Sequence, residues 1–199
     1  MNRKFVMLKM FLAKSGYKRA SIIKKYDVFH SIGERCYYHP FKLPAEPHLV
    51  SFGNNVFIAT DVRLVTHNMA SAMFAVSIKK SLAIYTGKIE IGNNVFIGAG
   101  AMVMPNVKIG NNCVVAAGAV VTHNIPDGEI WGGVPAVKIG NYESLKNKCI
   151  NYSEEFKRAT ENMDCSLYDK QIKYFWNKEE HWYENINYKK LSKLYGCWT

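Results

Sequence analysis

The sequence predicts a mainly β protein, built as a parallel β-helix with helical extensions at both ends. A large apolar residue recurs every six positions between Tyr85 and Val121, and a second, usually smaller apolar residue follows each one four places later. An α-helix repeats near 3.6 residues and an amphipathic strand repeats at 2, so a strict period of six over about forty residues fits neither. Very short strands separated by turns, and stacked as successive coils, produce this period.

Both positions of each repeat are expected in the core, because each coil buries its apolar residues against its neighbours. The predicted inward residues are Tyr85, Ile91, Ile97, Val103, Ile109, Val115 and Val121, with Ile89, Val95, Ala101, Val107, Cys113, Ala119 and Ile125 as their partners. Gly92 and Gly110 follow large residues, and the pairs 93–94 and 111–112 that come next are asparagines. Both residue types tolerate the left-handed backbone that tight corners need.

An earlier block has the same period, with Phe52, Ile58 and Leu64 six apart and Val50, Val56 and Val62 as their partners. Leu64 and Tyr85 are 21 positions apart, which is not a multiple of six. Residues 67–84 are therefore expected to leave the stack as a loop, and loops that leave a regular scaffold often carry function. His67 is the first residue of this loop.

The remaining chain divides into an N-terminal segment, residues 1–45, and a C-terminal segment, residues 140–199, on either side of the β-helix at 46–139. The N-terminal segment begins with residues at helical spacing and continues, from residue 28, as a proline-containing connector; the helical residues are Phe5, Leu8, Phe11 and Leu12. The C-terminal segment is polar, charged and aromatic, and it is expected to form a helical cap over the open end of the stack.

The net charge of +10 is concentrated at the N-terminus, where residues 1–27 contain eight Lys and Arg against Asp27 alone. This segment is expected to be a solvated helical face or a contact for a membrane surface or glycolipid, through an attraction that salt screens. No apolar run approaches the roughly 18 residues of a membrane span, so a cytoplasmic protein is expected. The five cysteines have neither zinc nor disulfide spacing.

Three features together indicate a family. The first is the set of repeats, and the second is His67 at the point where the six-residue spacing is interrupted. The third is the pair of segments Ile91–Gly98 (IGNNVFIG) and Gly132–Ala136 (GGVPA). The sequence resembles the hexapeptide-repeat acyltransferases. More narrowly, it is similar to the galactoside, maltose and xenobiotic O-acetyltransferases and their relatives encoded with polysaccharide biosynthesis. The resemblance implies a left-handed β-helix, a homotrimer, and acetyl-CoA in a groove between neighbouring subunits, with no metal required.

The resemblance also implies residue roles. His67 is the expected general base, because an imidazole can take the proton of an attacking hydroxyl near neutral pH and return it to the departing thiolate. The expected contacts with acetyl-CoA are Phe96, Gly98, Ala99, Ala117, Gly118, Thr122, His123 and Lys138. His123 stands where relatives have lysine, and Lys138 is displaced from the basic position that usually follows Pro-Ala. The expected contacts with the acceptor are His39, Asn68 and Tyr85.

The acceptor that the resemblance favours is a sugar hydroxyl, as in a surface polysaccharide precursor, and no nucleic acid partner is expected. N-acetylation of an amino sugar and acetylation of a xenobiotic are the alternatives on the same chemistry. A γ-type carbonic anhydrase needs three zinc-binding histidines, whereas only His67 and His123 occur between Val50 and Ile125. A trimeric scaffold without enzymatic activity is the remaining alternative, and it would bind no acetyl-CoA.

Overall fold

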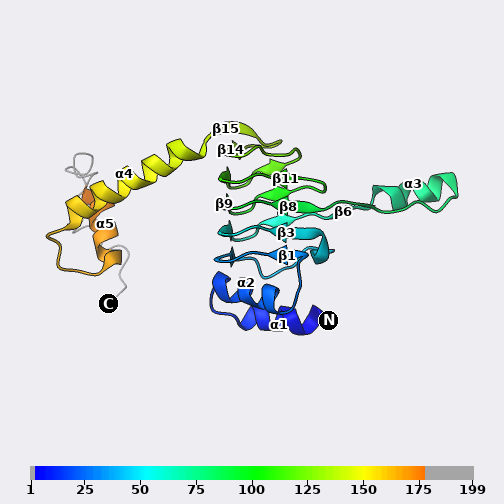
Figure 1. The fold of residues 1–199 in the computed structure, drawn as a ribbon, viewed down its shortest axis with the longest axis horizontal. Coiled ribbons are helices and arrows are strands. Elements are labelled where there is room, and N and C mark those ends of the chain that lie inside the picture. Colours follow the sequence, from blue (N-terminus) through cyan, green and yellow to red (C-terminus); the bar gives the residue numbers. More distant parts are fainter. Residues whose placement is uncertain (1–2, 178–199) are drawn as a thin grey trace, which may run out of the picture. The chain divides into compact units, whose positions relative to one another are not determined.

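A computed structural model describes residues 3–177. Its central part is a stack of parallel coils (Figure 1). The strands of these coils form three sheets. Sheet A contains β1 (Ser31–Ile32), β3 (Val50–Phe52), β8 (Ile89–Ile91) and β11 (Lys108–Ile109). Sheet B contains β2 (Tyr37–Tyr38), β4 (Val56–Ile58), β9 (Val95–Ile97), β12 (Cys113–Val115), β14 (Glu129–Gly132) and the antiparallel β15 (Val137–Asn141). Sheet C contains β5 (Arg63–Leu64), β10 (Met102–Val103) and β13 (Val120–Val121).

The core of the stack is the set of residues that the sixfold period places inside. Every predicted inward residue is buried except Tyr85, which is 56% exposed. The prediction is wrong for Tyr85, which continues the period but lies before the coil that begins at β8. The period therefore identifies the core correctly from Ile89 onward and in the earlier block.

One coil is much longer than the others. Ile91 pairs with Ile109, 18 residues later, whereas Val50 pairs with Ile89, 39 residues later. The extra residues form an antiparallel ribbon of β6 (His67–Asn68) and β7 (Tyr85–Thr86) that ends in helix α3 (Ala70–Ile78) (Figure 1). The expected loop is confirmed, and it is a helix-tipped hairpin, which we call the arm. No side chain of α3 is buried.

The corners between sheets A and B use asparagine and glycine for different reasons. Asn55, Asn94 and Asn112 have φ angles of 58°, 56° and 55°, which confirms the left-handed corner expected there. Gly92 does not have a positive φ; instead, a Cβ at this position would lie 2.8 Å from the backbone carbon of Gly110 on the next coil. The glycine is required because adjacent coils approach closely. A left-handed backbone, the reason expected from the sequence, does not apply at Gly92.

The same corners carry a ladder of amide side chains. The backbone N–H of Asn54 donates to Oδ1 of Asn93 at 2.8 Å, and that of Asn93 donates to Oδ1 of Asn111 at 2.9 Å. The ladder ends at Asp127, whose carboxylate accepts from the backbone N–H of Asn111 at 2.8 Å and from its side-chain amide at 3.0 Å. These hydrogen bonds lower the pKa of Asp127.

The stack begins earlier than the repeats indicate. Strands β1 and β2 lie in the segment expected to be an irregular connector, and they pair in parallel with β3 and β4. A short 3₁₀ helix, η1 (Pro47–Leu49), then leads into β3. Ile32 and Tyr38 on these strands are six residues apart and pair with Phe52 and Ile58, but two positions are too few to form a recognisable period.

Two helices precede the stack, α1 (Arg3–Leu12) and α2 (Gly16–Lys25). Val6 and Met10 on α1 are completely buried in the core cluster. The residues that define the helical spacing in the sequence lie on the opposite side and are 48–69% exposed; they are Phe5, Leu8, Phe11 and Leu12. Helix α1 is therefore apolar on both faces, and the face indicated by the sequence pattern is turned to solvent.

Helices α4 (Tyr142–Thr160) and α5 (Leu167–Asn177) follow β15. The chain separates into two compact units, with the division after Leu145. In the second unit, Tyr174 on α5 packs edge-on against the rings of Tyr152 and Phe156 on α4. The helices expected in this segment are present, whereas their role as a cap stays a prediction; residues 178–199 of the segment lie outside the described chain.

Candidate active site

His67 lies where the chain leaves the stack, at the corner that follows strand β5 of sheet C. Its backbone begins the arm, and it pairs with Thr86 on the returning strand. The Nδ1 atom of its ring lies 3.0 and 3.1 Å from the two carboxylate oxygens of Glu46. The side chains of His67 and Glu46 are 31% and 29% exposed, so this pair is accessible from solvent but shielded on most sides.

The contact with Glu46 fixes which ring nitrogen of His67 holds the proton. An ionised carboxylate can only accept hydrogen bonds, so Nδ1 must be the protonated nitrogen in the neutral ring. The lone pair is then on Nε2, and Nε2 makes no hydrogen bond to any described residue. An imidazole held in this way presents a free proton acceptor, which is the requirement for a general base.

Glu46 is itself held in place by Thr66, a buried neighbour of His67. The hydroxyl of Thr66 donates to Oε2 of Glu46 at 2.5 Å, and the backbone N–H of Glu46 donates to the same hydroxyl oxygen at 3.2 Å. The hydroxyl of Thr66, followed by the ring of His67, lowers the pKa of Glu46 below its ordinary value. Glu46 is consequently a carboxylate at neutral pH.

Arg3 on α1 fixes the chain immediately before Glu46. Its guanidinium donates to the carbonyl oxygens of Ala45 at 2.7 Å, Pro44 at 2.8 Å and Leu43 at 3.3 Å. One planar group thus holds three carbonyls and restrains residues 43–46, which belong to no strand. Helix α1 is thereby linked to the carboxylate that orients His67.

The sequence analysis did not identify Glu46, Thr66 or Arg3. The sequence does contain one signal for Glu46, which is the only acidic residue between Arg35 and Thr60. The contact between Glu46 and His67 could not be inferred from their spacing, because the two side chains meet only when the chain completes one turn of the stack.

Four of the residues expected to contact acetyl-CoA lie together at the corner between sheets B and C; they are Gly98, Ala99, Ala117 and Gly118. Adjacent coils are joined there by the N–H of Gly98, which donates to Val115, and by that of Gly118, which donates to Ala99, both at 2.8 Å. The N–H groups of Ala99 and Ala117 make no hydrogen bond within residues 3–177. This corner therefore presents two open donors on neighbouring coils.

The other expected acetyl-CoA contacts lie elsewhere. Phe96 is 46% exposed on the outer face of sheet B, in register with Phe57 and Val114. Thr122 and His123 follow β13, at the same corner as His67 but two coils further along, and Thr122 Oγ1 lies 2.9 Å from Nδ1 of His123. Lys138 on β15 forms an ion pair with Glu129 at 2.7 Å.

The three expected acceptor contacts are also separated. His39 follows β2 at the corner between sheets B and C, and its Nδ1 atom is buried without a hydrogen-bond partner among the described residues. Asn68 Oδ1 accepts from the backbone N–H of Ala70 at 2.8 Å, which fixes the start of α3. The hydroxyl of Tyr85 accepts from the side-chain amide of Asn106 at 2.7 Å. One chain thus places His67 at one corner of the stack and His39 at another.

Comparison with known proteins agrees with this architecture. Residues 88–123 match the family model described as bacterial transferase hexapeptide (six repeats). Protein CapG of Staphylococcus aureus is 42% identical over 119 residues, which cover 59% of this chain and 67% of that protein. The chain belongs to the bacterial hexapeptide transferases.

Solved structures of other proteins share the fold of this hexapeptide transferase. A maltose O-acetyltransferase from Clostridium difficile 630 is 23% identical, with a TM-score of 0.50, over 70% of this chain and 85% of that one. A galactoside acetyltransferase in complex with coenzyme A is 24% identical, with a TM-score of 0.52, over 72% of this chain and 80% of that one. The family match and these likenesses imply the left-handed coil that the sequence resemblance predicts.

Within residues 3–177, no three or more His, Cys, Asp and Glu side chains are grouped so that they could hold a metal ion. No helix in this part of the chain has both the length and the apolar character needed to cross a membrane.

Proposed function

We propose that this protein transfers an acetyl group from acetyl-CoA to a hydroxyl of a sugar, in the precursor of a surface polysaccharide. The observation on which the proposal rests is the pair of His67 and Glu46, which leaves Nε2 of His67 open as a proton acceptor. Membership of the hexapeptide transferases supports the reaction class. The fold shared with a maltose and a galactoside acetyltransferase supports a sugar acceptor.

The pair of side chains suits the chemistry of acyl transfer to an alcohol. Acetyl-CoA, when bound, supplies the acetyl group as a thioester. Nε2 of His67 takes the proton of the acceptor hydroxyl as the hydroxyl oxygen bonds to the thioester carbonyl carbon, and it returns that proton to the sulfur as the carbon–sulfur bond breaks. Glu46 holds the ring in the required tautomer and stabilises the positive charge that the ring acquires.

The corner between sheets B and C suits the arm of the donor. The free N–H groups of Ala99 and Ala117 can donate to the amide oxygens of a pantetheine chain lying along the stack. Phe96 offers an exposed ring on the adjoining face. Lys138 would have to exchange its ion pair with Glu129 for a phosphate of the nucleotide end.

A homotrimer would complete this site. His67, Thr122 and His123 occupy one corner of the stack, whereas the open donors at Ala99 and Ala117 occupy another. A neighbouring copy that sets its B–C corner against the His67 corner of the first would place donor, base and acceptor in one groove. The half-buried ring of His39 on the B–C corner and the side-chain amide group of Asn68 beside His67 would then face the acceptor from two subunits.

The proposal is tested by thiol release from acetyl-CoA across a panel of sugars, nucleotide sugars and amino sugars. Substituting His67→Ala is expected to lower the rate on the best acceptor by on the order of 10² to 10⁴. His30→Ala is the matched control, because His30 is a histidine outside this site, and it should keep the parent rate. Equal thiol release by the parent and His67→Ala on every acceptor would exclude His67 as the base. Faster release with an amino sugar would assign N-acetylation instead.

A further inference from the structure

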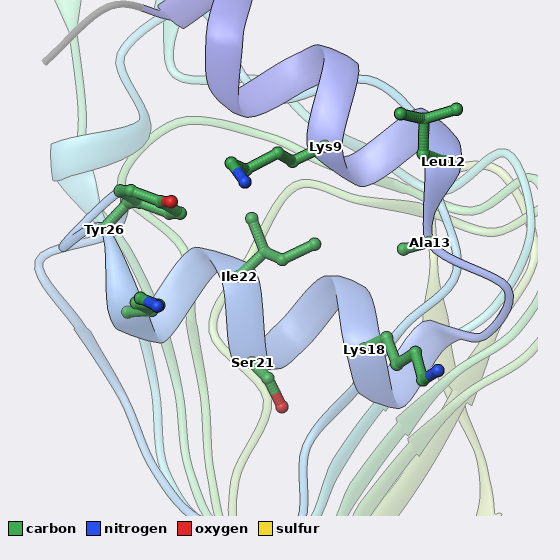
Figure 2. Close-up of a pocket in the computed structure, with 8 residues that line it drawn as sticks. Lys9, Leu12, Ala13, Lys18, Ser21, Ile22 and Tyr26 are labelled. Atoms are coloured by element: carbon green, nitrogen blue, oxygen red, sulfur yellow. The ribbon is translucent and has the colours of Figure 1, made fainter.

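Helices α1 and α2 enclose a groove with a volume of 440 Å³ that lies outside the candidate active site. Figure 2 shows Lys9 of α1 and Ile22 of α2 facing each other across this groove, with Tyr26 towards one end and Lys18 towards the other. Lys25 also lines it. The groove therefore has an apolar floor and a basic rim, and we call it, together with the exposed side of α1, the α1–α2 face.

The exposed side of α1 is apolar, although the helix already has a buried apolar side. Val6 and Met10 pack into the core, while Leu8, Phe11 and Leu12 are 57–69% exposed. Contiguous apolar patches on a protein surface usually mark an interaction site. The outer side of α1 thus has the composition of a surface that is covered in use.

The positive charge around this apolar patch is not neutralised by ion pairs among residues 3–177. Within the described residues no carboxylate forms an ion pair with Lys9, Lys18 or Lys25, whereas Lys24 is paired with Glu34. The two arginines of this segment are committed to backbone carbonyls, Arg3 at residues 43–45 and the buried Arg19 at Tyr38 and Ala13. Three lysines beside exposed leucine and phenylalanine side chains form a surface that is both cationic and apolar.

We infer that the α1–α2 face docks on a membrane surface containing anionic lipids. Charge complementarity selects this partner, because the lysines would contact lipid phosphates while Leu8, Phe11 and Leu12 enter the boundary between headgroups and acyl chains. A soluble polyanion would satisfy the lysines but would leave these three side chains in water. The inference concerns where the protein is held, and it does not depend on the acyl-transfer reaction proposed above.

Sedimentation of the full chain with vesicles tests this inference. Vesicles of phosphatidylcholine alone and vesicles with about a third phosphatidylglycerol are compared between about 0.05 and 0.5 M NaCl. Binding is expected to the anionic vesicles only, and it should weaken as salt rises, because salt screens attraction between exposed charges. Equal binding to both vesicle types, or binding to neither, would overturn the inference.

Two double variants locate the surface. K18Q/K25Q is expected to weaken binding by about 30-fold, since each lysine near an anionic surface contributes about a fivefold factor. L8S/L12S should also weaken binding, and both variants are expected to fold because all four side chains are exposed. The matched controls are K79Q/K80Q and M73S/V76S on the exposed arm, which remove equal charge and similar apolar surface.

The controls also separate the alternative partners. Loss of binding in the arm variants, with none in the α1–α2 variants, would move the membrane contact to the arm and overturn the inference. Sedimentation velocity without vesicles gives the subunit number, and a change in it for L8S/L12S would identify the face as an interface between copies. Binding to a soluble polyanion that competes fully with vesicles and is insensitive to L8S/L12S would likewise exclude the lipid contact.

Discussion

Nδ1 of His67 lies 3.0 Å from Oε2 of Glu46, and the two residues stand at opposite ends of one coil. Glu46 comes just before η1 and β3, which open this coil, and His67 comes just after β5, which closes it. One turn of the stack therefore brings the carboxylate and the imidazole together. The stack positions a pair of side chains that would be far apart in an extended chain.

Substituting Glu46→Gln is expected to lower kcat by on the order of 10- to 1000-fold while leaving KM for acetyl-CoA near its parent value. Glutamine keeps the size of the side chain but loses the charge that stabilises protonated His67, and its amide can donate to Nδ1 and so favour the wrong tautomer. Steady-state thiol release measures both constants. A parent kcat in this variant would show that Glu46 does not position the base.

The stability that Glu46 contributes should disappear in acid. Its pKa is lowered in the folded chain by Thr66 and His67, so its contribution is fully present above the unfolded value of about 4.3. The contribution is lost as pH falls through the lower folded value. The difference in Tm between the parent and Glu46→Gln, followed by circular dichroism from pH 7 to pH 3, is expected to shrink below about pH 4. An undiminished difference at pH 3 would contradict the assignment.

Gly92→Ala is expected to destabilise the stack by about 2 kcal/mol, because the new Cβ would lie 2.8 Å from backbone atoms of Gly110, which cannot move aside. Gly100→Ala is the comparison. Gly100 has a φ of 69° and open space around it, so alanine there costs about 1 kcal/mol through backbone strain alone. Denaturant unfolding gives both values, and a smaller cost at Gly92 than at Gly100 would refute close approach as the reason for Gly92.

Replacing residues 70–83 of the arm with a short Gly-Ser turn is expected to change the free energy of unfolding of the chain by less than about 1 kcal/mol. No side chain of α3 is buried, so its removal exposes no core. If the arm packs against a neighbouring subunit, sedimentation velocity at low concentration will show a smaller assembly for this variant. Failure of the variant to fold would mean that the arm stabilises its own chain.

The repeats allowed most of the stack to be predicted, because alternate side chains of each short strand face the core. The core residues from Ile89 to Ile125, the asparagine corners and the departure of the chain at His67 all follow from the count of six. Tyr85 continues the count by coincidence, since it lies in the arm. The first coil has only two residues at this spacing, Ile32 and Tyr38, which are too few to be recognised as a repeat.

The candidate site was less predictable, since its members meet only in three dimensions. His67 was found because the sixfold period ends there. Glu46 lies in a segment without a pattern, and the helical spacing around Arg3 does not show that its side chain reaches the residues before Glu46. The side of α1 could not be assigned either. Its sequence has apolar residues on both faces, and only packing against the stack decides that Val6 and Met10 face inward.

The amide ladder at the corners between sheets A and B runs in one direction along the stack. At every step the donor belongs to the earlier coil and the accepting oxygen to the later one, from Asn54 through Asn93 and Asn111 to Asp127. During synthesis, the corner N–H of each new coil is therefore expected to gain its side-chain acceptor only when the next coil has been made. A chain truncated before Asp127 would leave the N–H of its last corner without a side-chain acceptor. Shortening the arm removes no member of the ladder, so the protein is expected to tolerate a shorter arm far better than a shorter stack of coils.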